Sequence, residues 1–308
     1  MRIHEKDILS DAYGRYGVGA FNVFNAEQVL GVFRGAKKAE MPVIVQITPV
    51  ARNYIQPELL EGIIAGAAQI YPDVTFSVHL DHGNEQHCLS AIDSGDYSSV
   101  MIDASHEPFE ENVRITKNIV EKAHDKGIWV EAELGVLSGV EDHLKIDDDK
   151  ALYTDPAQVE EFVGKTHCDS LAVAVGTSHG AYKFSGGRGL RLDILATIRD
   201  RLPAGYPLVL HGASAVPANE INRINQTGGQ LKSEAKGVDP TELMAALRLG
   251  VCKINIATDM RLIWTRVTRE FFHDHPDQFD PVISGKTYMD ALEDFVDEKC
   301  RKLKIINS

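Results

Sequence analysis

A repeated alternation of short apolar runs and amphipathic stretches constrains the fold of this 308-residue chain more than any other feature. Eight runs rich in β-branched residues are each followed by a polar turn, as expected for strands that alternate with helices. The predicted strands are residues 17–25, 42–48, 75–82, 98–105, 129–135, 170–179, 207–214 and 253–259. The predicted helices include residues 26–40, 112–127, 155–166 and 239–250, several of which begin with Asp-Pro and end near glycine.

Near-continuous apolar strands that alternate with amphipathic helices are typical of a parallel sheet covered on both faces. Eight units fit a closed barrel better than an open sheet. We therefore expect one α/β domain over residues 1–308, a (β/α)8 TIM barrel with a helical extension at its C-terminal end. The competing doubly wound fold needs a nucleotide fingerprint, but NVFNAEQ rather than GxGxxG follows the first strand, and GxxxxGK[ST] does not occur.

Charge and cysteine usage narrow the class of partner and the compartment. A net charge of −13 opposes general attraction to nucleic acid, so an anionic ligand would need a local binding site. The N-terminal segment is charged where a signal peptide is apolar, and no run of about 18 apolar residues occurs. We expect a cytoplasmic protein that does not enter a membrane. The four cysteines are far apart without a CxxC pair, which argues against disulfides and a thiolate zinc site.

Polar side chains stand at almost every predicted strand end. Because the carboxyl ends of barrel strands meet at one rim, groups far apart in sequence can surround one small molecule there. These residues are Asn22, Asn25, Thr48, Asp81, His82, Asp103, Ser105, Glu133, His179, His211, Ser214, Asn255 and Asp259. The pattern predicts a convergent active site at this rim.

Three of the strand-end residues are histidines beside small residues, in LDHG, GTSHG and LHGAS. Neutral imidazole binds zinc well, and three protein ligands with one open position are the usual catalytic arrangement. We interpret His82, His179 and His211 as zinc ligands, although any one of them could instead be a hydrogen-bonded histidine at the rim. His79 shares a strand face with Asp81 and is interpreted as a core residue or as support for the ligands.

Acidic residues in otherwise apolar strands point to the same rim. Asp81, Asp103 and Glu133 stand in such strands, whereas the run at 147–149 is interpreted as solvated. A buried carboxylate is costly unless a cation or hydrogen bonds compensate it, and a metal ion would do so.

Seven segments follow one another with the order and approximate spacing of a known family: HLDHG, VMIDAS, VEAELG, YTDPAQVEEFVGKT, DSLAVAVGTSHGAYKF, LHGAS and GVCKINIATDMR. Over essentially its whole length the chain resembles the class II fructose-bisphosphate aldolases of the shorter type. The resemblance implies a zinc-dependent lyase of glycolysis and gluconeogenesis that reversibly cleaves fructose 1,6-bisphosphate to dihydroxyacetone phosphate and glyceraldehyde 3-phosphate. It also implies a homodimer or homotetramer with a monovalent cation, Na+ or K+, near the phosphate.

The resemblance also implies roles for individual residues. The metal ligands would be His82, His179 and His211, with Glu133 and Asp103 in alternative or supporting positions. Asp81 matches the acid that protonates the C4 oxygen during condensation, and Glu141 matches the loop glutamate that exchanges a proton with the three-carbon enediolate. Zinc on the carbonyl and hydroxyl oxygens can stabilise the charge left by cleavage without a lysine Schiff base.

The predicted substrate contacts are Asn25 and Thr48, from their positions at strand ends, together with Gly180, Lys183, Gly212, Ser214, Asn255, Thr258 and Arg261, which the resemblance implies. Gly180, Gly212 and Ser214 belong with Asn255 and Thr258 to the cradle for the phosphate beside dihydroxyacetone. Lys183 matches a nearby cationic contact, and Arg261 matches a residue that reaches the second phosphate. Backbone N–H groups in glycine-rich turns are natural anion donors, which lets an acidic protein bind a phosphate.

Three positions depart from the family's pattern. Ala257 replaces an acid that contacts the sugar hydroxyls, as in the tagatose-bisphosphate branch, whereas Asp259 and Arg261 resemble the fructose branch. Val50 replaces a glycine after the second strand, and GKTY at 285–288 replaces a Pro-Arg segment near the far phosphate. The preferred sugar and the contacts to the far phosphate therefore stay open.

Other functions also stay open at this point. Tagatose 1,6-bisphosphate or another ketose phosphate is the close alternative substrate. A class I aldolase would need an inward lysine, and Lys253 is expected to open its strand on the wrong side of the barrel. A zinc hydrolase in which Asp81 activates a metal-bound water is an alternative of another class, and a noncatalytic metabolite-binding barrel is a third.

Overall fold

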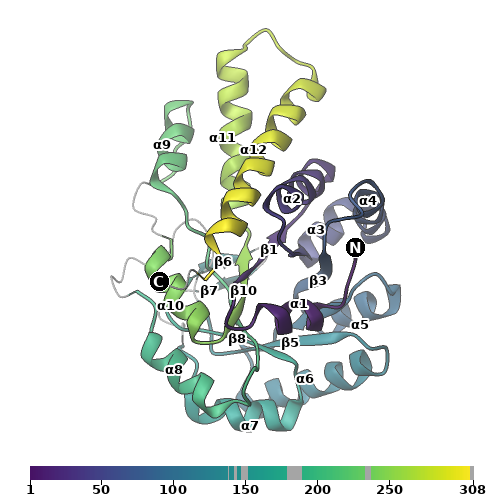
Figure 1. The fold of residues 1–308 in the computed structure, drawn as a ribbon, viewed down its shortest axis with the longest axis vertical. Coiled ribbons are helices and arrows are strands. Elements are labelled where there is room, and N and C mark those ends of the chain that lie inside the picture. The colour runs from purple at the N-terminus through teal and green to yellow at the C-terminus, as the bar shows by residue number, and fades with distance from the viewer. Residues whose placement is uncertain (138, 142–143, 147–151, 179–188, 233–236, 306–308) are drawn as a thin grey trace.

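Eight parallel strands close into a barrel in the computed structural model, which describes residues 1–137, 139–141, 144–146, 152–178, 189–232 and 237–305. The strand order around the barrel is β1-β10-β9-β8-β5-β4-β3-β2. These strands are β1 (Val18–Asn22), β2 (Val43–Ile47), β3 (Phe76–Gly83), β4 (Ser99–Ile102), β5 (Trp129–Leu134), β8 (Ser170–Val173), β9 (Leu208–Leu210) and β10 (Val251–Ile256). A separate antiparallel pair is formed by β6 (Gly139–Glu141) and β7 (Leu144–Ile146). The predicted (β/α)8 barrel is confirmed (Figure 1).

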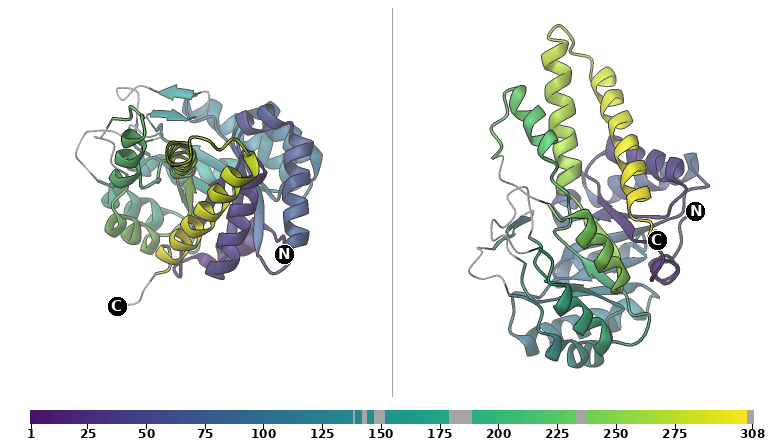
Figure 2. Two further views of the ribbon diagram at one scale, coloured as in Figure 1. Left: turned by 90° about the horizontal axis from the view of Figure 1, so that it is seen from above. Right: turned by 60° about the vertical axis from the view of Figure 1, so that its left-hand side comes forward.

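Helices surround the barrel, and α11 and α12 extend beyond it (Figure 2). The helices are α1 (Glu5–Ala12), α2 (Ala26–Ala39), α3 (Pro49–Ile55), α4 (Pro57–Ile70), α5 (Glu85–Ser94), α6 (Phe109–His124), α7 (Pro156–Thr166), α8 (Leu192–Arg201), α9 (Ala218–Gln226), α10 (Pro240–Arg248), α11 (Thr258–Asp274) and α12 (Pro281–Lys302). The Asp-Pro signals begin α7, α10 and α12, because each Asp side chain accepts a backbone N–H of the first turn. No helix in the described ranges is long and apolar enough to cross a membrane.

The C-terminal helix α12 packs closely against α2. Two glycines of α2 allow this approach, since a Cβ at Gly31 would lie 2.5 Å from the Leu292 Cβ, and one at Gly35 would lie 2.5 Å from the Val296 Cβ. The C-terminal extension is therefore packed directly on the barrel's outer helices.

Helix α1 closes the barrel at the amino ends of its strands. Ile8 and Leu9 belong to a buried apolar cluster with Val18 at the start of β1 and with Ile44 of β2. Glu5, at the start of the same helix, is only 1% exposed and hydrogen-bonds to side chains on strands inside the barrel. The barrel bottom is thus sealed by an element that also brings a carboxylate into the interior.

One strand boundary differs from the sequence prediction with a chemical consequence. Strand β10 begins at Val251, so Lys253 is its third residue rather than its first. Its side chain shares a face with Asn255, because alternate residues of a strand point the same way, and both lie inside the barrel. The expectation that Lys253 opens its strand was therefore wrong, and its side chain points inward, level with Val18 at the start of β1.

Candidate active site

An irregular backbone at the end of β3 brings two adjacent side chains to one place. A regular strand would point Asp81 and His82 to opposite faces. His82 instead has a left-handed backbone with φ of +48°, and the pairing of β3 with β4 shifts register between Leu80 and Gly83. As a result, ligand atoms of Asp81, His82 and His211 all lie within 4.8 Å of one another. Strain of this kind is typical of functional positions.

The His82 imidazole also lies close to two carboxylates. Its Nδ1 lies 3.0 Å from Asp103 Oδ2 and 3.9 Å from Glu133 Oε2. Asp103 Oδ1 accepts hydrogen bonds from the backbone N–H and the hydroxyl of Ser105. Burial alone would raise the pKa of Asp103, but the hydrogen bond and charge of His82, together with Ser105, hold that pKa below its usual range. Asp103 is therefore an ionised acceptor. We call Asp81, His82, Asp103, Glu133 and His211 the rim cluster.

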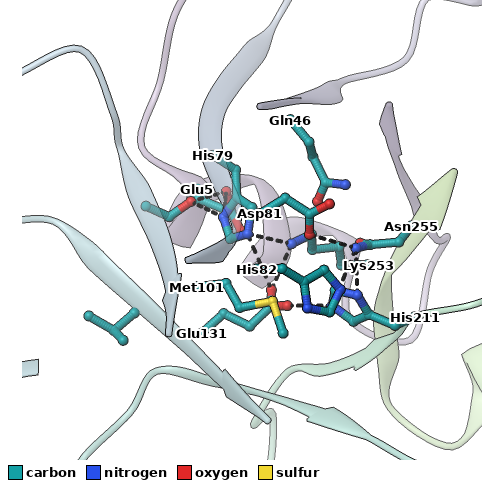
Figure 3. Close-up of polar contacts among 12 residues, drawn as sticks. Glu5, Gln46, His79, Asp81, His82, Met101, Glu131, His211, Lys253 and Asn255 are labelled. Atoms are coloured by element: carbon teal, nitrogen blue, oxygen red, sulfur yellow. Dashed lines mark hydrogen bonds and ion pairs between the residues drawn. The ribbon is translucent and has the colours of Figure 1, made fainter. Parts of the chain in front are cut away.

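His211 comes from the end of β9 and is completely buried. Its ring lies 4.5 Å from the His82 ring between centroids, with the planes near perpendicular (Figure 3). Burial lowers the pKa of His211, and repulsion by His82 lowers it further, against the opposing effect of Glu131. The neutral imidazole that results is the form that binds a metal ion.

Amide side chains hold the Asp81 carboxylate from both sides. Asn22 Nδ2 donates to Asp81 Oδ2 at 2.7 Å, and Asn255 Nδ2 donates to Asp81 Oδ1 at 3.1 Å. Gln46 in turn donates to Asn22 at 3.0 Å. Sequence reasoning missed Gln46, although a polar residue in the apolar run VIVQI is the same signal that identified the acidic residues.

A second polar group, the inner cluster, lies deeper in the barrel and consists of Glu5, His79, Glu131 and Lys253. Lys253 Nζ lies 2.7 Å from Glu131 Oε2 and 2.9 Å from His79 Nε2 (Figure 3). Burial would raise the pKa of Glu131, but the Lys253 charge and the His211 hydrogen bond hold it below its usual range. Sequence reasoning missed Glu131 and misplaced Lys253; the spacing of Glu131 two residues before Glu133 could have found the former.

Several predicted substrate residues begin helices at the strand ends. The Asn25 side chain caps α2, and the Thr48 hydroxyl caps α3, each by accepting a backbone N–H from the first turn. Thr258 is the first residue of α11, and the guanidinium of Arg261, one turn later, lies 5.1 Å from the centre of the Phe24 ring. Asn25 and Thr48 therefore have structural hydrogen bonds in addition to any contact with a ligand.

The loop after β9 carries Gly212 and Ser214. Gly212 has φ of +61°, and a Cβ there would lie 2.6 Å from the Ser178 carbonyl oxygen, so only glycine fits this close approach. Beyond Ser214, which is buried, the backbone N–H groups of residues 215 and 216 donate to the two oxygens of Asp259 at 2.9 and 2.8 Å. The Asp259 side chain thus holds this loop by accepting hydrogen bonds from the loop's backbone.

Four of the predicted site residues cannot be placed by their side chains. His179, Gly180 and Lys183 lie outside the described residues. Glu141 ends strand β6, but its side chain lies outside the described part as well.

Both polar clusters contain donor sets that suit a divalent metal. Ligand atoms within 4.8 Å of one another occur in Asp81–His82–His211, in His82–Asp103–Glu133 and in Glu5–His79–Glu131. Two members of the last set, His79 and Glu131, contact the Lys253 ammonium, which already supplies a cation. The two sets of the rim cluster share His82 and combine imidazole with carboxylate, as zinc sites do. The rim cluster is therefore the candidate metal centre.

Comparisons with known proteins show which family the chain belongs to. The family model for class-II fructose-bisphosphate aldolase matches residues 4–308. A fructose-bisphosphate aldolase of Thermus caldophilus is 45% identical over 267 residues, which cover 86% of each chain. One from Giardia intestinalis is 44% identical over 270 residues, covering 87% of this chain and 81% of the relative.

Solved structures show the same likeness. The YdjI aldolase from Escherichia coli K12 superposes with a TM-score of 0.79 at 30% identity, covering 98% of this chain and 97% of that one. A putative fructose-1,6-bisphosphate aldolase from Coccidioides immitis reaches a TM-score of 0.81 at 25% identity, covering 97% and 95%. With a barrel of this topology, a rim of histidines and carboxylates, and matches over nearly its whole length, the chain belongs to the class II fructose-bisphosphate aldolase family, whose members are metal-dependent lyases.

Proposed function

We propose that this chain is a zinc-dependent aldolase that reversibly cleaves fructose 1,6-bisphosphate to dihydroxyacetone phosphate and glyceraldehyde 3-phosphate. The observation that carries the proposal is the position of Asp81. Its buried carboxylate is held by two amides within reach of the His82 and His211 ligand atoms, so an acid–base group adjoins a metal donor set. A noncatalytic binding barrel needs no such arrangement.

In this proposal His82 and His211 hold zinc together with His179, and Asp103 and Glu133 are alternative or supporting ligands. The donor types and their spacing support this set. Bound zinc would supply a Lewis acid that stabilises negative charge on the substrate oxygens as the carbon–carbon bond breaks. The neutral state of His211 and the ionised state of Asp103 suit metal binding without prior proton loss.

Asp81 is the proposed base that removes the C4 hydroxyl proton during cleavage and returns it during condensation. Its hydrogen bonds from Asn22 and Asn255 fix the carboxylate, and both of these partners are neutral amides. We assign the second proton transfer, at the three-carbon fragment, to Glu141. Each positioned acid–base group contributes roughly 10²- to 10⁴-fold to a rate.

The substrate phosphate next to dihydroxyacetone is assigned to Gly180, Gly212, Ser214, Asn255 and Thr258. The start of the 17-residue helix α11 at Thr258 supports this assignment, because helix amino ends attract anions. Lys183, Arg261, Asn25 and Thr48 complete the proposed contacts, with a Na+ or K+ ion near the phosphate. We further propose that residues 1–308 act as one catalytic domain in a cytoplasmic homodimer or homotetramer.

One observation favours tagatose 1,6-bisphosphate as a second substrate. Ala257, at the end of β10, is only 7% exposed and offers no polar side chain to a sugar hydroxyl. A site that lacks a hydrogen bond to a hydroxyl discriminates weakly against the epimer that places it differently. We therefore rank fructose bisphosphate first and expect measurable cleavage of tagatose bisphosphate.

A coupled cleavage assay with both sugars, before and after dialysis against a chelator, tests the function. Cleavage should disappear with the metal and return with zinc, and borohydride should trap no substrate on a lysine. Asp193→Asn changes an exposed carboxylate paired with Arg191 and is the matched control, which should behave as wild type. Full activity without metal, or phosphate release without carbon–carbon cleavage, would overturn the proposal, the second result in favour of a hydrolase.

A further inference from the structure

The inner cluster forms a continuous chain of hydrogen bonds below the candidate metal centre. His79 Nδ1 lies 2.6 Å from Ser99 Oγ, and the Ser99 hydroxyl donates to Glu5 at the start of α1. His79 Nε2 contacts the Lys253 ammonium, which also contacts Glu131. All of these residues are at most 1% exposed. Buried charges are costly, so this arrangement must be maintained by its pairings.

Glu131 connects this chain to the rim cluster by dividing its two oxygens between two partners. Its Oε2 lies 2.7 Å from Lys253 Nζ, and its Oε1 lies 2.8 Å from His211 Nε2. A carboxylate held at one oxygen by an ammonium cannot rotate freely, so the other oxygen keeps its direction toward His211. An ionised carboxylate only accepts hydrogen bonds, and His211 Nε2 must therefore carry the proton.

Asn255 defines the other nitrogen of the same ring. Its Nδ2 lies 2.8 Å from His211 Nδ1, compared with 3.3 Å from Nε2, and also donates to the Asp81 carboxylate. An amide nitrogen only donates, so Nδ1 carries the lone pair. The two contacts select the tautomer whose Nδ1 is free of a proton and directed away from Glu131.

We infer that Glu131 and Lys253 are positioning residues that hold His211 in the tautomer whose Nδ1 keeps a lone pair for a metal ion, which would take the place of the Asn255 N–H there. Glu131 accepts the Nε2–H, and Lys253 fixes Glu131. Metal-bound histidines commonly donate their other ring N–H to an acceptor, and loss of such an acceptor typically weakens metal binding 10- to 100-fold. The inference rests on the proposed zinc function. It adds the residues of the barrel interior that orient one of the proposed zinc ligands.

Two double variants of equal charge test this inference. Glu131→Leu/Lys253→Met removes the ion pair and the acceptor, whereas Glu131→Gln/Lys253→Met removes the ion pair but leaves an amide oxygen that can accept the His211 N–H. Zinc affinity, measured by competition with a chelating dye, should fall roughly 10- to 100-fold in the leucine variant. The glutamine variant should bind zinc about tenfold more tightly than the leucine variant. Unfolding of the metal-free proteins should be similar, because both lose Glu131 and Lys253 together and keep the same Glu5 and His79.

Glu131→Gln alone adds a second contrast. With Lys253 present, the amide oxygen should turn to the ammonium and the amide NH2 to His211, which favours the wrong tautomer. Zinc binding should therefore be weaker than in Glu131→Gln/Lys253→Met. Glu61→Gln, in the buried Arg52–Glu61 pair of α3 and α4, is the control and should keep wild-type zinc affinity.

Equal zinc affinities of the two double variants would overturn the inference and leave the proposed function intact if wild type still binds zinc and cleaves the sugar. A wild-type protein that binds no zinc would overturn both.

Discussion

The rim cluster and the inner cluster both contain histidines and carboxylates, but only the rim cluster is suited to bind a metal ion. Each contains a set of imidazole and carboxylate atoms within 4.8 Å of one another. The inner cluster contains the Lys253 ammonium, which lies within 3 Å of His79 and Glu131, so the chain itself already supplies a cation there. The rim cluster combines histidines and carboxylates beside amides. Donor spacing alone therefore does not identify a metal site; a protein cation inside the set decides against it.

The largest expected effect on activity comes from removing a histidine of the rim cluster. His211→Ala should lose zinc and reduce cleavage to background, because it removes a proposed metal ligand. Metal content by mass spectrometry and the cleavage assay measure the result. His79→Gln, in the inner cluster, is the counterpart and should retain zinc and activity within about tenfold. Loss of zinc from both variants alike would erase the distinction between the clusters.

The next effect separates metal binding from proton transfer within the rim. Asp81→Asn should retain zinc but cleave roughly 10²- to 10⁴-fold more slowly, because the amide keeps one oxygen that can accept from Asn22 or Asn255 but cannot accept the C4 proton. The ratio of kcat to metal content is the measurement. A variant that loses its zinc would instead make Asp81 primarily a ligand.

Stability should distinguish the clusters in the metal-free protein. Lys253→Met leaves Glu131 buried without its cation, and loss of one partner of a buried pair typically lowers the free energy of unfolding by about 3–5 kcal/mol. Denaturant unfolding after chelation measures this loss. Lys126→Met disrupts an exposed pair with Asp93 and should change the midpoint little. An unchanged midpoint for Lys253→Met would show that the inner cluster tolerates an unpaired carboxylate.

The smallest effect concerns the choice of sugar at the edge of the rim. Ala257→Asp should raise the preference for fructose over tagatose bisphosphate by about tenfold in kcat/KM, equivalent to about 1.4 kcal/mol in the transition state. The added carboxylate would contact a hydroxyl that the alanine leaves without a partner. A wild-type preference for tagatose bisphosphate of at least about tenfold would reverse our ranking of substrates and leave the metal centre unaffected.

Local sequence patterns determined the architecture and the position of most site residues along it. These patterns depend only on neighbouring residues, so they can be recognised without knowing the fold. They are the β-branched runs, the helical periodicity and the Asp-Pro caps at Asp155, Asp239 and Asp280. Barrel topology then implied that polar strand ends share a rim, and the structure does bring Asp81, His82 and His211 together.

Only the tertiary structure decided how these residues are aimed and what lies beneath them. The left-handed backbone of His82 arises where β3 loses register with β4, a property of two strands rather than of one. Lys253 reads as the start of a strand in sequence, yet it meets Glu131 from 122 residues away, and Glu131 meets His211 from 80 residues away. Such pairings depend on barrel closure and on α1 sealing its lower end. No local periodicity encodes them, because contacts between distant segments exist only once the chain between them has folded.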